Sequence, residues 1–410
     1  MNRDKRNLKD KNTRNKIMAF AILIITLIMA MAPGAHGDGD VTNKLIAVAM
    51  ALDYEDGEIK TTISAAVPKP GSSESSAVIG IPVSGKGKSV AECLSNVERK
   101  TGKSLETGLC GVVILGENLA KEGAQVVLST VLSAGIVSPG AFLAQADGTD
   151  GEEIIKQSTA LQFDSATALT ELMSGASKNT GSKVITLLQF VSDGASINKT
   201  AVAPLVSMQK AQSAGGGSGG SEEGALGGES ASFEPCEVEK NALYKGGRLV
   251  GKLDEEASRG LSYSDVHTEK GALVCPDFVI GGRNVGTVSG EISSVKFANS
   301  VRFDGDTPHS VLDVKITLKA ADRERVNEVA MQKNLSPDEV NEAYKRNFER
   351  RIKNEVEKTL SQSLALDCDV FETEQKLFRF HTKKYKEFAR SGEKVTKACR
   401  FEVKTEITIL

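Results

Sequence analysis

Apolar and polar positions alternate along the chain in patterns that predict both strands and helices. Residues 43–67 predict a β-hairpin, because an apolar run reaches the turn Asp56-Gly57 and an alternating return strand follows. Residues 89–100 instead repeat their apolar positions every three to four residues, with Ser89 in the N-cap position. This second period predicts an amphipathic helix.

The next part of the chain repeats a strand-then-helix plan. A continuous apolar strand at 112–115 precedes a helix at about 118–132, and a strand at 141–146 precedes a helix from Gly151. A last strand is expected near 203–208. Strands that alternate with helices in this way indicate an α/β domain.

Residues 211–232 are rich in Gly and Ser and carry three Glu, which is typical of a solvated linker. Beyond it, residues 241–263 predict two short strands around a Lys-Gly-Gly-Arg turn, followed by an acidic helix start. Three further strands are expected at about 285–297, 299–303 and 310–319.

The clearest predicted helix begins near residue 336. Ser336 is placed to cap it, Pro337 occupies its first position, and Glu339 completes a capping box. Its apolar stripe, spaced every fourth residue, is Val340, Tyr344, Phe348, Ile352, Val356 and Leu360. Such a stripe predicts packing against a sheet. A second helix over 370–388 and a final alternating strand at 399–410 are expected after it.

The first 37 residues have the organisation of an export signal. Seven Lys and Arg within residues 1–16 precede the apolar run 17–32, and Ala35-His36-Gly37 fits a cleavage site. An uncleaved N-terminal anchor helix is the alternative that this pattern leaves open. Either way, positive residues held inside place the rest of the chain outside the cytoplasm.

Charge argues against nucleic acid as a partner. The whole chain has a net charge of −3, but without residues 1–16 it holds 44 basic and 52 acidic residues, a net of −8. An acidic body without Trp is poorly suited to phosphate backbones or to base stacking.

The six cysteines allow two interpretations. They fall along the chain as the neighbouring pairs Cys93/Cys110, Cys236/Cys275 and Cys368/Cys399. In an oxidising compartment they would allow three local disulfides, and otherwise they are six thiols acting as small apolar side chains. The spacing holds no Cys-x-x-Cys motif, which argues against a thiol metal or redox site.

The sequence offers no pattern of catalytic or metal-binding residues, so we expect no enzyme, no cofactor and no metal. The four His are scattered, and the G-x-S-x-G match at 216–220 lies in the Gly-rich linker without a strand or helix around it. Asp304 and Asp306 suit a hairpin turn better than a calcium loop. The acidic residues 254–256 suit a helix start, where they favour the helix dipole.

The basic residues at 379–386 allow two interpretations. Lys383, Lys384 and Lys386 lie close to Arg379 on a predicted helix. They form either an ordinary solvated face or a surface attracted to anionic lipid, if that face lies near a membrane.

Three ordered segments resemble the GerAC-like family, the C subunits of bacterial spore germinant receptors. Residues 241–263 resemble its hairpin and following helix start, residues 109–128 its strand–"iGeelak-G"–helix unit, and residues 186–206 a segment that ends at a Pro. The matching positions, all of structural type, are Gly116, Glu117, Gly123, Pro204, Leu249, Gly251, Leu253, Glu256, Arg259 and Gly260. The resemblance covers nearly all of residues 40–410.

The resemblance implies a non-enzymatic subunit on the extracytoplasmic face of the spore inner membrane. It implies integral membrane A- and B-type subunits and the membrane surface as partners in nutrient-triggered germination. One departure concerns anchoring: the family usually begins with a lipoprotein signal, yet no Cys follows the apolar run until Cys93. The uncleaved apolar helix would then replace the lipid anchor.

Together these patterns predict an α+β, multi-domain protein with mixed sheets and flanking helices. The expected segments are a signal or anchor region at 1–37, an N-terminal domain at 38–210, a linker at 211–232 and a C-terminal domain at 233–410. The alternative function is an extracytoplasmic protein that binds a small ligand outside any receptor complex.

Overall fold

The computed structural model describes most of the chain in mixed α+β form, at residues 44–68, 78–160, 167–208, 236–265 and 267–410. The predicted signal or anchor region 1–37 and the predicted linker 211–232, with its G-x-S-x-G match, lie outside these residues. Among the described residues, none forms a helix both long and apolar enough to cross a membrane.

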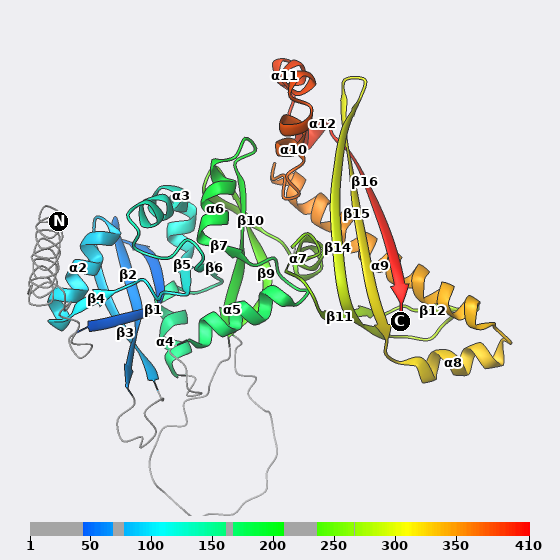
Figure 1. Cartoon of the computed structure of the whole chain (residues 1–410), viewed down its shortest axis with the longest axis horizontal. Helices are drawn as coiled ribbons and strands as arrows, with labels where there is room; N and C mark the ends of the chain where they lie inside the picture. The colour runs from blue at the N-terminus through cyan, green and yellow to red at the C-terminus, as the bar shows by residue number, and fades with distance from the viewer. Residues whose placement is uncertain (1–43, 69–77, 161–166, 209–235, 266) are drawn as a thin grey trace, which may run out of the picture. The chain divides into compact units, whose positions relative to one another are not determined.

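The first half of the chain builds a mixed sheet of ten strands (Figure 1). Its main path has the order β10-β9-β8-β6-β5-β1-β2-β3, while β4 pairs with β1 and β7 with β6. In chain order the strands are β1 Lys44–Glu55, β2 Glu58–Pro68, β3 Val78–Gly87, β4 Ser104–Glu106, β5 Val112–Leu115, β6 Phe142–Ala146, β7 Ile185–Thr186, β8 Thr200–Met208, β9 Cys236–Lys245 and β10 Arg248–Lys252.

Helices cover both faces of this sheet, as the run of four buried residues in β5 requires. Val113 and Leu115 face a core shared with helices α2, α3 and α6, while Val112 and Ile114 face one shared with α4 and α5. These helices are α2 Val90–Thr101, α3 Glu117–Ser133, α4 Gly151–Ala160, α5 Ala168–Lys178 and α6 Leu187–Ala195.

The predicted elements of this half are confirmed. The hairpin turns at Asp56-Gly57, with both residues at positive φ, and Ser89 caps α2 by accepting a hydrogen bond from the Glu92 amide. The alternating strands and helices over 112–160 also form where expected.

The first sheet uses strands from both sides of the predicted linker. β8 pairs antiparallel with β9 from Thr200↔Lys245 to Met208↔Cys236, and β10 then forms the sheet edge. Residues 236–252, which the sequence assigns to the second domain, therefore complete the sheet of the first. The domain boundaries themselves stay a prediction.

The second half builds a four-stranded sheet of order β11-β14-β15-β16 and a two-stranded one of β12 and β13. Its strands are β11 Gly271–Cys275, β12 Val279–Ile280, β13 Arg283–Asn284, β14 Val288–Asp304, β15 Thr307–Ala320 and β16 Arg400–Ile409. The prediction of three strands over 285–319 was wrong. These residues form one long hairpin of two strands, because β14 continues through residue 298 to the turn. Asp304 and Asp306 flank Gly305 in that turn, as predicted.

Helix α9, Pro337–Ala365, runs along this sheet and confirms the predicted amphipathic helix (Figure 1). Its capping box between Ser336 and Glu339 is complete. From Tyr344 to Leu360 the predicted stripe is buried, and it packs with the inward residues of β15, such as Val314 and Ile316.

The prediction of a single helix over 370–388 was wrong. It is split into α10, Thr373–Phe380, and α11, Thr382–Arg390. His381 breaks it, since its backbone leaves the helical region at φ −130° and its ring nitrogen Nε2 lies 3.0 Å from the carbonyl oxygen of Val301. The remaining helices are α7 Glu255–Ser262, α8 Arg323–Gln332 and α12 Val395–Ala398.

All six cysteines are free thiols in the structure. Cys93, Cys110, Cys275 and Cys368 are buried, and Cys236 and Cys399 are half-buried. Burial raises the pKa of the Cys110 thiol to about 12. The structure therefore matches the interpretation of the cysteines as small apolar side chains.

The core role of α9 predicts the effect of truncating its stripe. Ile352→Ala should lower the free energy of unfolding by about 2–5 kcal/mol, because Ile352 is fully buried and leaves a cavity. The exposed neighbour Asn354 is the control. Asn354→Ala should change the free energy of unfolding by less than about 0.5 kcal/mol. Urea unfolding measures both, and equal losses would contradict the packing of α9.

Candidate functional site

The family-motif positions from Gly251 to Gly260 lie at one place, the contact between the β10–α7 unit and helix α9. Two glycines set how closely the elements approach. A Cβ added at Gly260 would lie 2.3 Å from the carbonyl oxygen of Glu355, and one added at Gly251 would lie 2.5 Å from Leu366 Cδ1. Leu253, also in the motif, is fully buried between them. We name this contact the α7–α9 joint.

A buried carboxylate lies at the centre of the α7–α9 joint. Glu355 is only 1% exposed and accepts hydrogen bonds from the Tyr263 hydroxyl at 2.6 Å and from Arg259 Nη1 at 3.0 Å. Arg351 Nε adds an ion pair at 2.9 Å. Burial raises the pKa of Glu355, and the two hydrogen bonds and the charges of both arginines oppose that rise by stabilising the ionised form.

Acidic residues at the start of α7 form the outer part of the joint. Asp254 caps the helix by accepting from the Ala257 amide, which confirms the predicted helix start. Glu256 pairs with Lys358 at 2.7 Å and with Arg351 at 2.9 Å, and both cations lower the pKa of Glu256. The sequence explained these acids by the helix dipole alone, and their partners on α9 were not predicted.

The motif positions around α3 contact the same β9–β10 hairpin from the other side. Glu117 pairs with Lys252 at 3.0 Å, and Lys252 also reaches Asp147 at 2.7 Å. Gly123, at φ 133°, interrupts α3 so that the Ala124 amide donates to the Gly247 carbonyl at 2.9 Å. Two motifs that lie far apart in the sequence are thus brought together.

Gly116 and Pro204 serve the sheet itself. A Cβ added at Gly116 would lie 2.0 Å from Asp53 Oδ1, a buried carboxylate that caps α4 by accepting from the Gly151 and Glu152 amides. Pro204 pairs with Asn241 of β9, one residue outside the parallel pairing of β8 with β6. Because proline has no backbone N–H, it cannot donate to a neighbouring strand, but at position 204 no backbone hydrogen bond to β6 is lost.

The central residue Glu355 was missed by the sequence analysis. A signal was present, because Glu355 lies three residues after Ile352 and directly before Val356, on the flank of the apolar stripe. A charge at such a position needs a partner. The sequence could not show which elements supply it.

The described residues hold no group of three or more His, Cys, Asp and Glu that could bind a metal ion. The polar side chains of the α7–α9 joint bind one another. The arrangement can therefore fix one part of the fold against another.

The joint predicts opposite effects for two glycine substitutions. Gly260→Ala should lower the free energy of unfolding by about 1–3 kcal/mol, because α7 must move away from α9. The matched control is Gly175→Ala on helix α5, where an added Cβ meets nothing within 4 Å, and it should raise stability by about 0.4–1 kcal/mol. Chemical denaturation distinguishes them, and a neutral Gly260→Ala would contradict the close contact.

Comparison with known proteins gives the family. The family profile described as "Spore germination protein N-terminal domain" matches residues 39–208, and the one described as "Spore germination B3/ GerAC like, C-terminal" matches residues 239–410. No curated protein matches the chain. The crystal structure of the GerBC protein is similar in fold, with a TM-score of 0.52 at 13% identity over 88% of this chain and 97% of that one. The chain therefore belongs to the GerAC-like family of spore germination proteins, the C subunits of germinant receptors.

Proposed function

We propose that the protein acts as a non-enzymatic subunit of a spore germinant receptor, in a complex with integral membrane A- and B-type subunits. In this role it contributes to nutrient-triggered germination from the extracytoplasmic face of the spore inner membrane. The observation that carries the proposal is the α7–α9 joint: the motif residues Arg259 and Gly260 are used to dock one element on another.

A docking role explains why the motif at 249–260 has a glycine where no side chain would fit. Gly260 brings the backbones of α7 and α9 together, and the ion pairs of Glu355 and Glu256 surround that contact. A buried charge with several partners resists rearrangement, because the loss of one partner leaves that charge incompletely compensated away from water. Such a joint suits a protein that must present its two sheets to partners in one arrangement.

Spore germination provides the test of this role. In a host that lacks the gene, the wild-type chain should restore the loss of optical density that follows addition of rich medium. Glu355→Gln should restore it at least several-fold more slowly, because Arg259 loses its charged partner and Arg351 keeps only Glu256. Glu357→Gln is the control, since Glu357 is exposed on the same helix.

The same strains show whether the partners are the proposed ones. Tagged wild-type chain, extracted from spore membranes in mild detergent, should retain A- and B-type subunits, and the Glu355→Gln chain should retain less at equal protein level. Normal nutrient germination without the gene, or a tagged chain recovered alone, would refute the receptor role.

Membrane association is supported by the surface around helix α11. Five exposed cations lie there, and none of them forms an ion pair within the described part of the chain: Arg379, Lys383, Lys384, Lys386 and Arg390. Phe380 is 64% exposed beside them, with the Arg379 guanidinium 5.5 Å from its ring centre. Exposed cations around an aromatic side chain favour an anionic lipid surface, by about 1 kcal/mol per cation.

Vesicle binding tests this surface. Residues 38–410 should bind phosphatidylcholine vesicles that contain phosphatidylglycerol and should bind pure phosphatidylcholine weakly. Reversing Lys383, Lys384 and Lys386 to Glu should reduce binding at least tenfold in a sedimentation assay, since each cation contributes about 1 kcal/mol. Residues 1–37 are omitted because their apolar stretch would bind lipid by itself.

A matched triple controls for net charge. Lys296, Lys319 and Lys333 are exposed on other elements, and reversing them to Glu changes the total charge equally. This control should bind almost as the wild type does. If both triples lose binding equally, the effect is one of overall charge and α11 is not the contact.

A further inference from the structure

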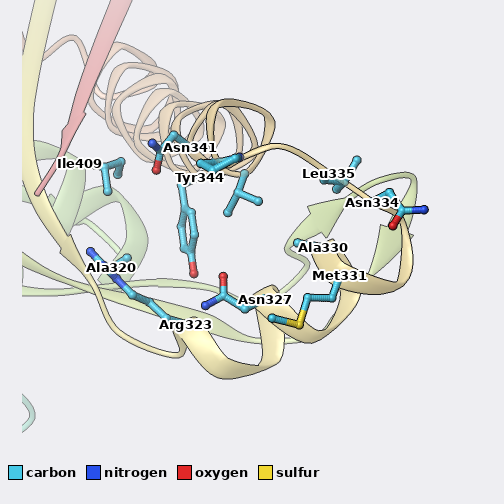
Figure 2. Close-up of a pocket in the computed structure, with 12 residues that line it drawn as sticks. Ala320, Arg323, Asn327, Ala330, Met331, Asn334, Leu335, Asn341, Tyr344 and Ile409 are labelled. Carbon is cyan, nitrogen blue, oxygen red and sulfur yellow. The ribbon is translucent and has the colours of Figure 1, made fainter.

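A cavity of about 620 Å³ lies between helix α8 and the start of helix α9, at the ends of β15 and β16 (Figure 2). Its apolar wall is formed by Ala320, Ala330, Leu335, Val340 and Ile409, with the ring of Tyr344. Two of these are alanines, which leave room that larger residues would fill. The volume is in the range of small-molecule sites.

Tyr344 provides a polar group inside this cavity. Its side chain is only 3% exposed, and its hydroxyl oxygen is buried without a hydrogen-bond partner. Figure 2 shows the side chain extending from α9 with the hydroxyl directed toward Arg323 and Asn327 of α8. Burial raises the pKa of Tyr344 to about 12, so the hydroxyl keeps its proton at neutral pH.

An unpartnered buried hydroxyl needs an explanation, because leaving a polar group unsatisfied destabilises the folded state. Elsewhere in the chain, buried tyrosines are satisfied: Tyr263 donates to Glu355, and Tyr385 donates to Glu374 at 2.8 Å. Tyr344 differs in that it faces a cavity. A ligand in that cavity would supply the missing partner.

The lining residues define the chemistry of that ligand. Arg323 is the only charged residue among them, and Nη2 of its guanidinium donates to the main-chain oxygen of Leu410, which holds the side chain at the cavity. Asn327, Asn334 and Asn341 add amide groups. Met331, 79% exposed at the rim, is a flexible apolar side chain that adapts to different shapes.

We propose that this cavity binds a small carboxylate with an apolar body. The apolar body lies against Ala330, Leu335 and Ile409, and the carboxylate accepts hydrogen bonds from Arg323 and from the Tyr344 hydroxyl. Arginine and a neutral hydroxyl are both donors to a carboxylate, and a hydrogen bond to a charged group is the stronger kind. The proposal is independent of the receptor role, which rests on the α7–α9 joint.

The first experiment uses 3-(4-fluorophenyl)propionate as the probe and fluorine NMR as the readout. The full chain is placed in lipid nanodiscs, so that no free detergent competes for the cavity. The probe should bind with a Kd of about 1 mM or lower, as expected for a fragment of its size. Its neutral amide should bind about tenfold more weakly, because it lacks the charge that Arg323 recognises.

Two tyrosine variants locate the site. Tyr344→Phe should weaken probe binding about fivefold to tenfold and, without the probe, should raise the melting temperature, because it removes an unsatisfied buried hydroxyl. Tyr385→Phe is the matched control: it should lower the melting temperature by breaking the bond to Glu374 and leave probe binding unchanged.

Arg323→Gln separates charge recognition from apolar contact. It should bring the affinities of the carboxylate and the amide close together. No binding up to 10 mM, roughly ten times the expected Kd, would overturn the proposal. Equal binding by the wild type and Tyr344→Phe would also overturn it, because the probe would then lie elsewhere.

Discussion

The arrangement around Glu355 constrains much of this protein. A carboxylate on the core side of a long helix is held between a tyrosine hydroxyl and two guanidinium groups. Removing a charge from water has a large cost, and only excellent geometry offsets it. Helix α7 must therefore lie in one register on α9, because a shift along α9 would separate Arg259 from Glu355. The register in turn requires Gly260, where no side chain fits.

The same hairpin that leads into α7 is held from its other side. Lys252 of β10 pairs with Glu117 at the start of α3, and the Gly247 carbonyl accepts the Ala124 amide at the break in that helix. The β9–β10 hairpin thus contacts α3 through one motif and leads to α9 through another. In this chain, the positions of structural type that match the family motifs therefore serve to fix elements together.

The surfaces proposed for function lie away from this joint. Helix α11 follows the break at His381, and the Tyr344 cavity is formed by the first turns of α9 with α8. Because α9 carries both Tyr344 and Glu355, the cavity and the joint share one rigid element. Occupation of the cavity and docking of α7 therefore act on the same helix, about three turns apart.

Local rules determined a large part of this fold from sequence. Period and capping predicted the first hairpin, helix α2 and helix α9, since the relevant contacts lie within a few residues: Ser336 with Glu339, or Asp56 with Gly57. Family resemblance added the motif positions. Local rules failed where contacts between residues far apart in the sequence set the backbone conformation. At His381, for example, the ring lies 3.0 Å from the Val301 carbonyl oxygen and the expected helix is split.

The candidate site was only partly predictable for the same reason. The sequence singled out Glu256, Arg259 and Gly260, yet the buried partner of Arg259 lies ninety-six residues further on, at Glu355. Arg351, which pairs with both Glu256 and Glu355, was not singled out either. Likewise the sequence placed Tyr344 in the core stripe, but not beside a cavity. Sequence alone determined which residues are apolar or charged, and it predicted the helices whose period and caps are local, such as α2 and α9. Tertiary structure alone decided which charges are buried together and where space is left, because both depend on packing between elements remote in the chain.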